Sequence, residues 1–120
     1  MIKVSAEPWR KLVRVRISGL VTPEEVQTFV LQFRSAVESM CLGPDEFALL
    51  VETEGKTVQR QDVMDQFQEL IARPALRANR IAIVRDGVLG RMQARRLMEH
   101  RSGTAVFDNM TDADQWLRAA

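Results

Sequence analysis

The residues of this chain best suited to chemistry lie together in one polar segment that follows an apolar stretch. The segment reads Glu52-Thr53-Glu54-Gly55-Lys56-Thr57. Its last three residues match the end of a phosphate-binding P-loop, but that motif also needs a glycine at the position of Leu50. In α/β folds, residues at the end of a strand are well placed to contact a ligand. The sequence therefore predicts a ligand-binding or regulatory turn, rather than a nucleotide site, at Glu52, Glu54, Lys56 and Thr57.

Other catalytic residue sets are poorly represented. His100 is the only histidine and Cys41 is the only cysteine, so a zinc site built from the usual protein ligands is not expected. Cys41 has no internal disulfide partner, and its position at the end of an amphipathic segment predicts a buried structural thiol. The chain contains neither a Gly-x-Ser-x-Gly elbow nor a Gly-x-Gly-x-x-Gly loop. We therefore expect a non-enzymatic protein with no catalytic residue, metal or cofactor.

Seven arginines between residues 76 and 101 raise the question of nucleic-acid binding. Four of them fall at or near one predicted helix: Arg91, Arg95, Arg96 and Arg101. Aromatic residues are absent from that helix, acidic segments adjoin it, and the whole chain has a formal net charge of only +1. Dedicated nucleic-acid binders are more basic than this. We expect no nucleic-acid partner.

The 120 residues are enough for one domain, predicted to span 1–120, with 46% hydrophobic and 28% charged residues. No apolar run reaches the roughly 18 residues that a membrane-spanning helix needs. The first residues lack the apolar core of a secretion signal. These features predict a cytoplasmic protein that does not insert into a membrane.

The elements that would position these residues follow from the hydrophobic pattern. Two alternating strands are predicted at 2–6 and 12–17, the second with Val13, Val15 and Ile17 on one face and Arg14 and Arg16 on the other. The short connection between them, which contains Trp9, favours antiparallel pairing.

Helices and strands alternate through the rest of the chain. Thr22, Pro23 and Glu25 form a helix start with a capping box, and further helices are predicted at about 60–73 and 87–100, with a last one at the C-terminus opened by Thr111 and Asp114. The apolar strands between them are 47–51, 81–84 and 104–107. The order ββαβαβαβα predicts a single mixed, mostly parallel sheet of four or five strands with four helices. The expected core residues are Phe29, Phe33, Val37, Leu49, Val51, Phe67, Ile81 and Ile83, and the third helix is expected to pack through Val88, Leu89, Met92 and Leu97.

This order resembles the STAS/SpoIIAA-like family, whose founding members are anti-sigma-factor antagonists. The residues that carry the resemblance are the strand Arg14–Leu20 ending in a glycine, the apolar strands 47–51 and 81–84, and Ala105–Asp108 followed by a helix with Trp116 and Leu117. The ending looks most like a branch of uncharacterised bacterial SpoIIAA-like proteins. The resemblance implies a non-catalytic binding fold, and related sheets occur in lipid-carrying Sec14-type domains.

The phosphorylation switch of that family does not carry over to this chain. True antagonists have an Asp-Ser pair after the third strand, and a partner kinase phosphorylates the serine. The corresponding segment here has no serine, and Glu52 and Glu54 would repel a phosphate on Thr53 or Thr57.

Two functions stay open from the sequence. The first is a regulatory or protein-interaction domain, with itself as a homodimer or another protein as partner, whose contact surface is predicted at Trp9, Arg14 and Arg16 on an accessible, basic sheet face. The second is the binding of a small apolar ligand or lipid, as in Sec14-like domains, for which an apolar cavity of several hundred Å³ is the expected sign.

Overall fold

The computed structural model describes residues 1–55, 57–99 and 101–119, apart from the side chain of Ala75. These residues form one five-stranded sheet with the strand order β1-β2-β3-β4-β5. The first strand runs antiparallel to the second, and all later neighbours are parallel. The strands are β1 (Ile2–Glu7), β2 (Leu12–Ser18), β3 (Ala48–Glu54), β4 (Arg80–Arg85) and β5 (Thr104–Phe107).

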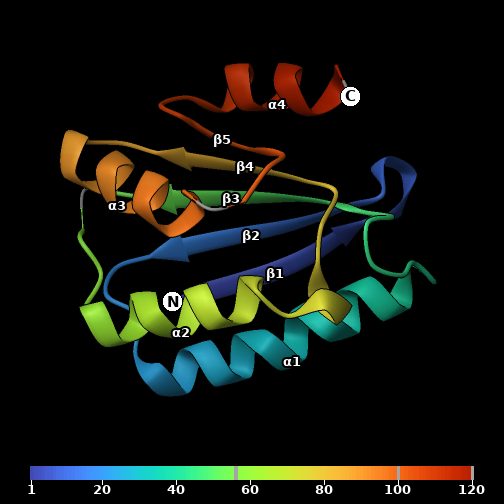
Figure 1. Ribbon diagram of the computed structural model, residues 1–120, viewed down its shortest axis with the longest axis horizontal. Helices are drawn as coiled ribbons and strands as arrows, with labels where there is room; N and C mark the ends of the chain where they lie inside the picture. Colours follow the sequence, from blue (N-terminus) through green and yellow to red (C-terminus); the bar gives the residue numbers. More distant parts are fainter. Residues whose placement is uncertain (56, 100, 120) are drawn as a thin grey trace.

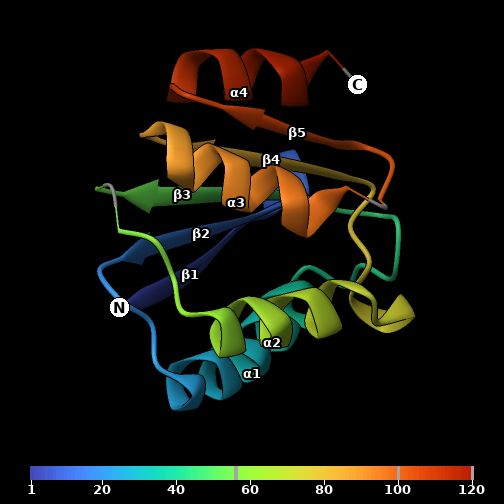
Figure 2. The ribbon, with the colours of Figure 1, turned by 60° about the vertical axis from the view of Figure 1, so that its left-hand side comes forward.

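Three helices connect the parallel strands, and a fourth follows the last strand. Their bounds are α1 (Pro23–Ser39), α2 (Gln61–Ile71), α3 (Val88–Met98) and α4 (Met110–Arg118). Each parallel strand is added on the same side of the previous one, so right-handed crossovers place α1, α2 and α3 on the same face of the sheet. The fourth helix lies on the opposite face (Figure 1), as a second view confirms (Figure 2). The expected mixed α/β fold with the order ββαβαβαβα is confirmed.

The first helix begins as its sequence predicts. The Thr22 side chain accepts a hydrogen bond from the backbone N–H of Glu25, and the Glu25 carboxylate accepts one from the backbone N–H of Thr22, both at 3.2 Å. Pro23 occupies the first turn, where its missing N–H is not needed. Both halves of the capping box are therefore formed, and local sequence alone fixes where α1 starts.

The main hydrophobic core lies between the sheet and the helices α1, α2 and α3. Phe33 is central to it, with ring centroids 5.8 Å from those of Phe29 and Phe47 in edge-to-face geometry. The predicted core is confirmed: six of its eight residues are buried in this cluster, and Val51 and Phe67 are partly buried against it.

A smaller hydrophobic cluster lies on the opposite face, under α4. Leu50 and Ala82 of the sheet are fully buried there against Ala113 of α4. Trp116 stacks beneath the guanidinium of Arg80, with 3.7 Å between Arg80 Cζ and the ring centroid. The helix begins earlier than predicted, because Asn109, rather than Thr111, accepts the capping hydrogen bond from the N–H of Asp112.

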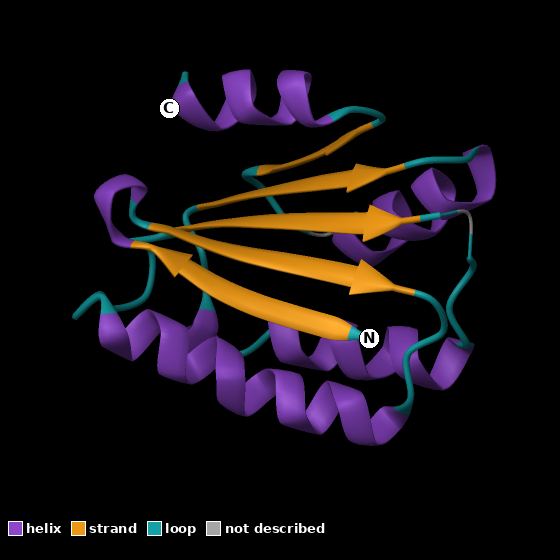
Figure 3. Ribbon diagram, turned by 180° about the vertical axis from the view of Figure 1, so that it is seen from behind, coloured by secondary structure: helices purple, strands orange, loops and turns teal. Residues whose placement is uncertain are grey.

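The same face is uncovered over β1 and the end of β2, because α4 packs mainly on β3, β4 and β5 and reaches β2 only at its start, where Leu12 is buried. Seen from behind, these two strands lie open to the viewer (Figure 3). Lys3, Ser5 and Arg16 point outward here and are exposed. This half of the sheet is the accessible face that the sequence predicts.

Candidate ligand-binding cavity

An apolar cavity lies between the sheet and the helices of its covered face. Its volume is about 100 Å³, and its wall is formed by inward side chains of β2, β3 and β4 together with α1, α2 and α3. Phe29, Phe67 and Leu97 contribute the helical side. This volume is smaller than the several hundred Å³ expected from the sequence, and smaller than the roughly 150 Å³ of an apolar cavity that binds benzene. The cavity alone therefore holds no more than a short acyl segment.

An external groove of about 290 Å³ runs between α2 and α3 next to the cavity. Met64, Gln93 and Leu97 line both spaces, so the groove adjoins the cavity across these side chains. The groove approaches the lower end of the roughly 300–1,000 Å³ typical of small-molecule sites. Three of its apolar side chains are exposed: Val58, Leu89 and Met92.

The helix α3 does not pack as the sequence predicts. Val88, Leu89 and Met92 were expected in the core, but they are exposed, and Leu89 is 68% accessible. Leu97 is partly buried against the core as predicted, and the fully buried residues of α3 are Gly90, Ala94 and Met98. Hydrophobic patterning gives weight to large apolar side chains, whereas this helix approaches the sheet through its two smallest residues. The Arg85 side chain takes up the space beside Gly90. Ala94 is small and lines the cavity that remains between α3 and the sheet.

A buried arginine closes one end of the cavity. Arg85 is the last residue of β4, and strand alternation places it on the same inward face as Ile81 and Ile83. Its side chain donates a hydrogen bond to the backbone carbonyl of Thr57, while its Nε–H has no partner among the residues that the structure describes. Desolvation on burial lowers the pKa of the Arg85 guanidinium from its ordinary value. The sequence interpretation missed this residue, although the alternation Ile81-x-Ile83-x-Arg85 already placed it inward.

The loop that leads into α2 is tied across this end of the cavity by two glutamines. The backbone N–H of Gln59 donates to Gln93 Oε1 at 3.2 Å, and Gln93 Nε2 donates to the Gln59 carbonyl at 3.0 Å. The Gln59 side chain then reaches the loop before α1, where it bonds the Val21 N–H and the Gly19 carbonyl. These bonds connect α3 with the two loops that follow β2 and β3. The carboxyl ends of the strands are where ligands of open α/β sheets bind.

The opposite end of the cavity carries a second arginine. Arg101 donates to the backbone carbonyl of Ala78, and within the described part of the chain its Nε–H has no partner. Burial lowers the pKa of Arg101, and the nearby Asp45 carboxylate partly offsets this effect. Arg77 and Asp45 form a bidentate ion pair close by, with hydrogen bonds of 2.6–3.2 Å. This end therefore has an acidic group at hand, unlike the end at Arg85.

The predicted acidic turn is split between the two faces of the sheet. The strand β3 continues to Glu54 instead of ending at Val51, so Glu52 and Glu54 point to the face away from the cavity. Thr53 is buried on the inward face, beside Arg85 in the register of β3 and β4. Thr57 contributes its carbonyl to Arg85, and Lys56 lies outside the described residues. Of the three described residues of the predicted turn, Thr57 is the one that is hydrogen-bonded to the cavity wall.

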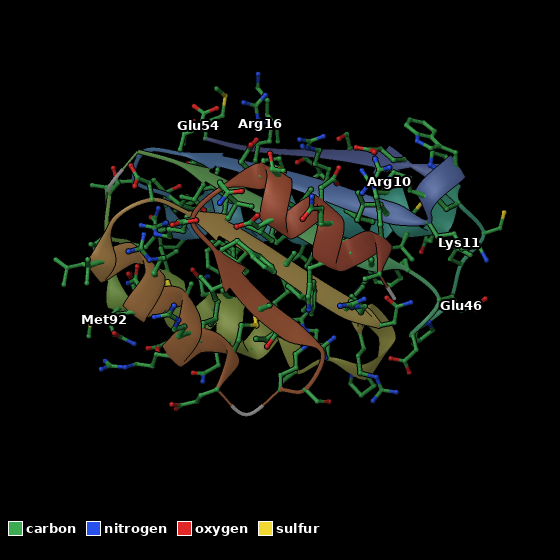
Figure 4. The ribbon with its side chains drawn as sticks, turned by 90° about the horizontal axis from the view of Figure 1, so that it is seen from above. Arg10, Lys11, Arg16, Glu46, Glu54 and Met92 are labelled. Atoms are coloured by element: carbon green, nitrogen blue, oxygen red, sulfur yellow. The ribbon has the colours of Figure 1, made fainter. Side chains whose placement is uncertain are left out.

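The predicted interaction surface is accessible but is not basic. Arg16 forms ion pairs with Glu52 at 2.9 Å and Glu54 at 2.6 Å, and Arg14 lies 3.5 Å from the Glu7 carboxylate. Parallel pairing of β2 with β3 sets Arg16 directly opposite Glu52, a contact that the sequence interpretation did not foresee. Figure 4 shows Arg16 and Glu54 side by side, on the opposite side of the molecule from Met92.

The exposure of Trp9 agrees with the sequence prediction, whereas the exposure of Cys41 does not. Trp9 lies in the short 3-10 turn Pro8–Arg10 and is 78% exposed, so it is available for contact as predicted. Cys41 was predicted to be buried, but it is exposed. It follows the end of α1 with φ of 56°, and this left-handed turn directs the thiol away from the core. His100 lies outside the described residues.

Among the described residues, no cluster of three His, Cys, Asp or Glu side chains could hold a metal ion. None of the helices in that part of the chain combines the length and apolar character needed to span a bilayer. No protein-family model matches this chain, and no curated protein matches it.

Proposed function

We propose that this chain is a non-enzymatic, SpoIIAA-like binding domain that holds a small apolar ligand between its sheet and the helices α2 and α3. The observation that carries the proposal is the apolar cavity and its adjoining groove. Protein interiors are close-packed, and an empty apolar cavity costs stability in proportion to its volume. A ligand that fills the cavity would recover that loss, which favours binding over a merely imperfect core.

The composition of the cavity wall supports binding rather than catalysis. Of the described residues that line it, none is Asp, Glu, His, Cys or Lys. General acid–base and nucleophilic chemistry depend mainly on these residue types. The polar groups that are present belong to Thr53, two glutamines and three arginines. Such groups orient and neutralise a ligand, so the proposal assigns the wall a recognition role.

Mass spectrometry of the protein purified from its own host tests the proposal. The intact protein is weighed under native conditions and again after denaturation in organic solvent. We expect an additional mass in the native spectrum that disappears on denaturation and is recovered in the organic extract. Identical protein masses under both conditions, together with an extract free of any stoichiometric small molecule, would contradict the proposal.

Protein contact through the uncovered half of the sheet is a second candidate, favoured by the exposure of Trp9. Tryptophan is among the residues that most often anchor interfaces. Charge reversal at Arg16 would break its ion pairs with Glu52 and Glu54, so Trp9→Ser is the cleaner variant. If this face pairs two copies, sedimentation should show a dimer for the natural chain and a monomer for Trp9→Ser. A monomer for both would remove the homodimer from consideration.

A further inference from the structure

The guanidinium of Arg85 is a buried positive charge with no counter-charge among the described residues. The residue is only 5% exposed, and its one acceptor there is the neutral carbonyl of Thr57. Asp86, its neighbour along the chain, uses its carboxylate to accept a hydrogen bond from the N–H of Gly87 at 2.8 Å. A buried charge without a partner is strongly unfavourable. The cavity therefore offers a cation that an anion could neutralise.

The start of α3 adds to the positive potential at this end of the cavity. Gly90, in the first turn of this eleven-residue helix, packs directly against the Arg85 side chain. First-turn N–H groups of a helix carry partial positive charge, which nearby acidic side chains often balance. The first turn of α3 contains no acidic residue. Two independent features thus favour negative charge at the same place.

The rest of the cavity wall is apolar, so an inorganic anion is a poor match for the cavity as a whole. Next to Arg85 on the inward face of β4 lie Ile83 and Ile81, and Phe67 and Leu97 face them from the helices. A hydrated ion gains nothing from such walls, whereas an apolar chain gains free energy for each buried methylene. The complementary ligand is therefore charged at one end and apolar over the rest of its length.

We infer that the cavity and the adjoining groove together bind a small amphipathic anion, with a carboxylate-like head group on Arg85 and an apolar chain that runs along Ile83 and past Leu97 into the groove. The inference rests on the proposed function, because it requires the cavity to take up an apolar group. A guanidinium offers several N–H donors in the planar arrangement that a carboxylate accepts. The Thr57 carbonyl uses only one of them, and the Nε–H has no partner in residues 1–55, 57–99 and 101–119.

Three probes that share a ten-carbon chain test the head group directly. Decanoate, decan-1-ol and decylammonium are titrated at neutral pH into the full chain, by displacement of the neutral fluorophore N-phenyl-1-naphthylamine. We expect decanoate to bind about tenfold or more tightly than decan-1-ol, because a hydrogen bond between charged groups contributes at least this factor to the affinity. Decylammonium, whose charge is repelled by Arg85, should bind most weakly. Equal affinities for decanoate and decan-1-ol would overturn the inference. Since this comparison uses the natural chain, it does not depend on any variant being folded.

Substitution of Arg85 identifies the residue responsible. Arg85→Met keeps much of the side-chain length but removes the charge. The control is Arg95→Met, which removes an exposed arginine of α3. We expect Arg85→Met to lose the preference for decanoate while still binding decan-1-ol, and Arg95→Met to keep the preference. An unchanged preference in folded Arg85→Met would overturn the assignment.

The binding results distinguish a failure of the proposed function from a failure of the anionic head group alone. Failure of all three probes and of the fluorophore to bind the natural chain would contradict the proposed function and the inference together. Binding of the fluorophore and decan-1-ol with no preference for decanoate would leave the apolar ligand standing and reject only its anionic head group.

Discussion

Gly90 stands directly against the side chain of Arg85. A methyl group at this glycine would lie 2.9 Å from Arg85 Cγ and closer still to Arg85 Nε. The arginine is buried, so it has little room to withdraw. The absence of a side chain at position 90 therefore allows Arg85 and α3 to occupy the same end of the cavity.

Substitution of this glycine should destabilise the protein through that contact. We expect Gly90→Ala to lower the free energy of unfolding by about 1–3 kcal/mol, the usual cost of overpacking, despite the better helix propensity of alanine. In an Arg85→Ala background the cost should largely disappear, which a double-mutant cycle in urea measures. The control is Gly43→Ala, whose new methyl group would meet only the end of the flexible Glu46 side chain. Additive effects at positions 85 and 90 would show that the close contact does not matter.

The core should depend strongly on the aromatic side chains of α1. Phe33 is 3% exposed and contacts two other phenylalanine rings, so we expect Phe33→Ala to cost about 3–5 kcal/mol of the free energy of unfolding. Leu31→Ala on the exposed face of the same helix is the control and should change it by less than about 0.5 kcal/mol. Chemical denaturation with constant m-values measures both. Similar losses for the two variants would contradict the observed orientation of α1.

The stability that the ion pair between Arg10 and Asp114 of α4 contributes should be lost at acidic pH. The hydrogen bond from Arg10, 2.6 Å long, is the main reason that the pKa of Asp114 is lowered from 3.8. A lowered pKa in the folded state means that the ionised form contributes stability above the unfolded pKa, and the contribution is lost as pH falls through the folded value.

Replacement of this carboxylate should remove that pH dependence. We expect Asp114→Asn to be less stable than the natural chain by about 0.2–1 kcal/mol at neutral pH, because the pair is partly exposed. The difference should shrink below about pH 4. Asp65→Asn, whose partner is the neutral side chain of Gln61, serves as the control. If the free energies of unfolding of the two proteins differ by the same amount at every pH down to about 2–3, the ion pair with Arg10 does not contribute as proposed.

Local rules carried most of the fold prediction. The alternation of Val13, Val15 and Ile17 gave the correct inward face of β2, and the capping box at Thr22 gave the correct start of α1. Both signals act within a few residues of the chain, so a single sequence is enough to interpret them. The order of elements predicted right-handed parallel crossovers. The strand order β1-β2-β3-β4-β5, which places these crossovers on one face, comes from the structure.

The candidate site depended on information that the local pattern lacks. The inward face of α3 was assigned to its large apolar residues, whereas the structure buries Gly90 and Ala94. That choice depends on what α3 meets, namely Arg85 at the end of β4, about five residues earlier in the chain but on another element. The extension of β3 to Glu54 likewise reflects its pairing with β2, in which Ser18 lies opposite Glu54. The inward face of α3 and the length of β3 are therefore both set by contacts with other elements.

Filling the cavity from within is the most direct test of the claim that it holds a ligand. Ala94 is buried on its wall, and a leucine there would occupy much of the volume of about 100 Å³. Ser35→Leu adds similar bulk at an exposed position of α1 and controls for adsorption to the surface. The measurement is the equilibrium binding of N-phenyl-1-naphthylamine to the three proteins, with circular dichroism to confirm folding. The account predicts that Ala94→Leu loses the binding that the natural chain and Ser35→Leu retain; undiminished binding by folded Ala94→Leu would contradict it.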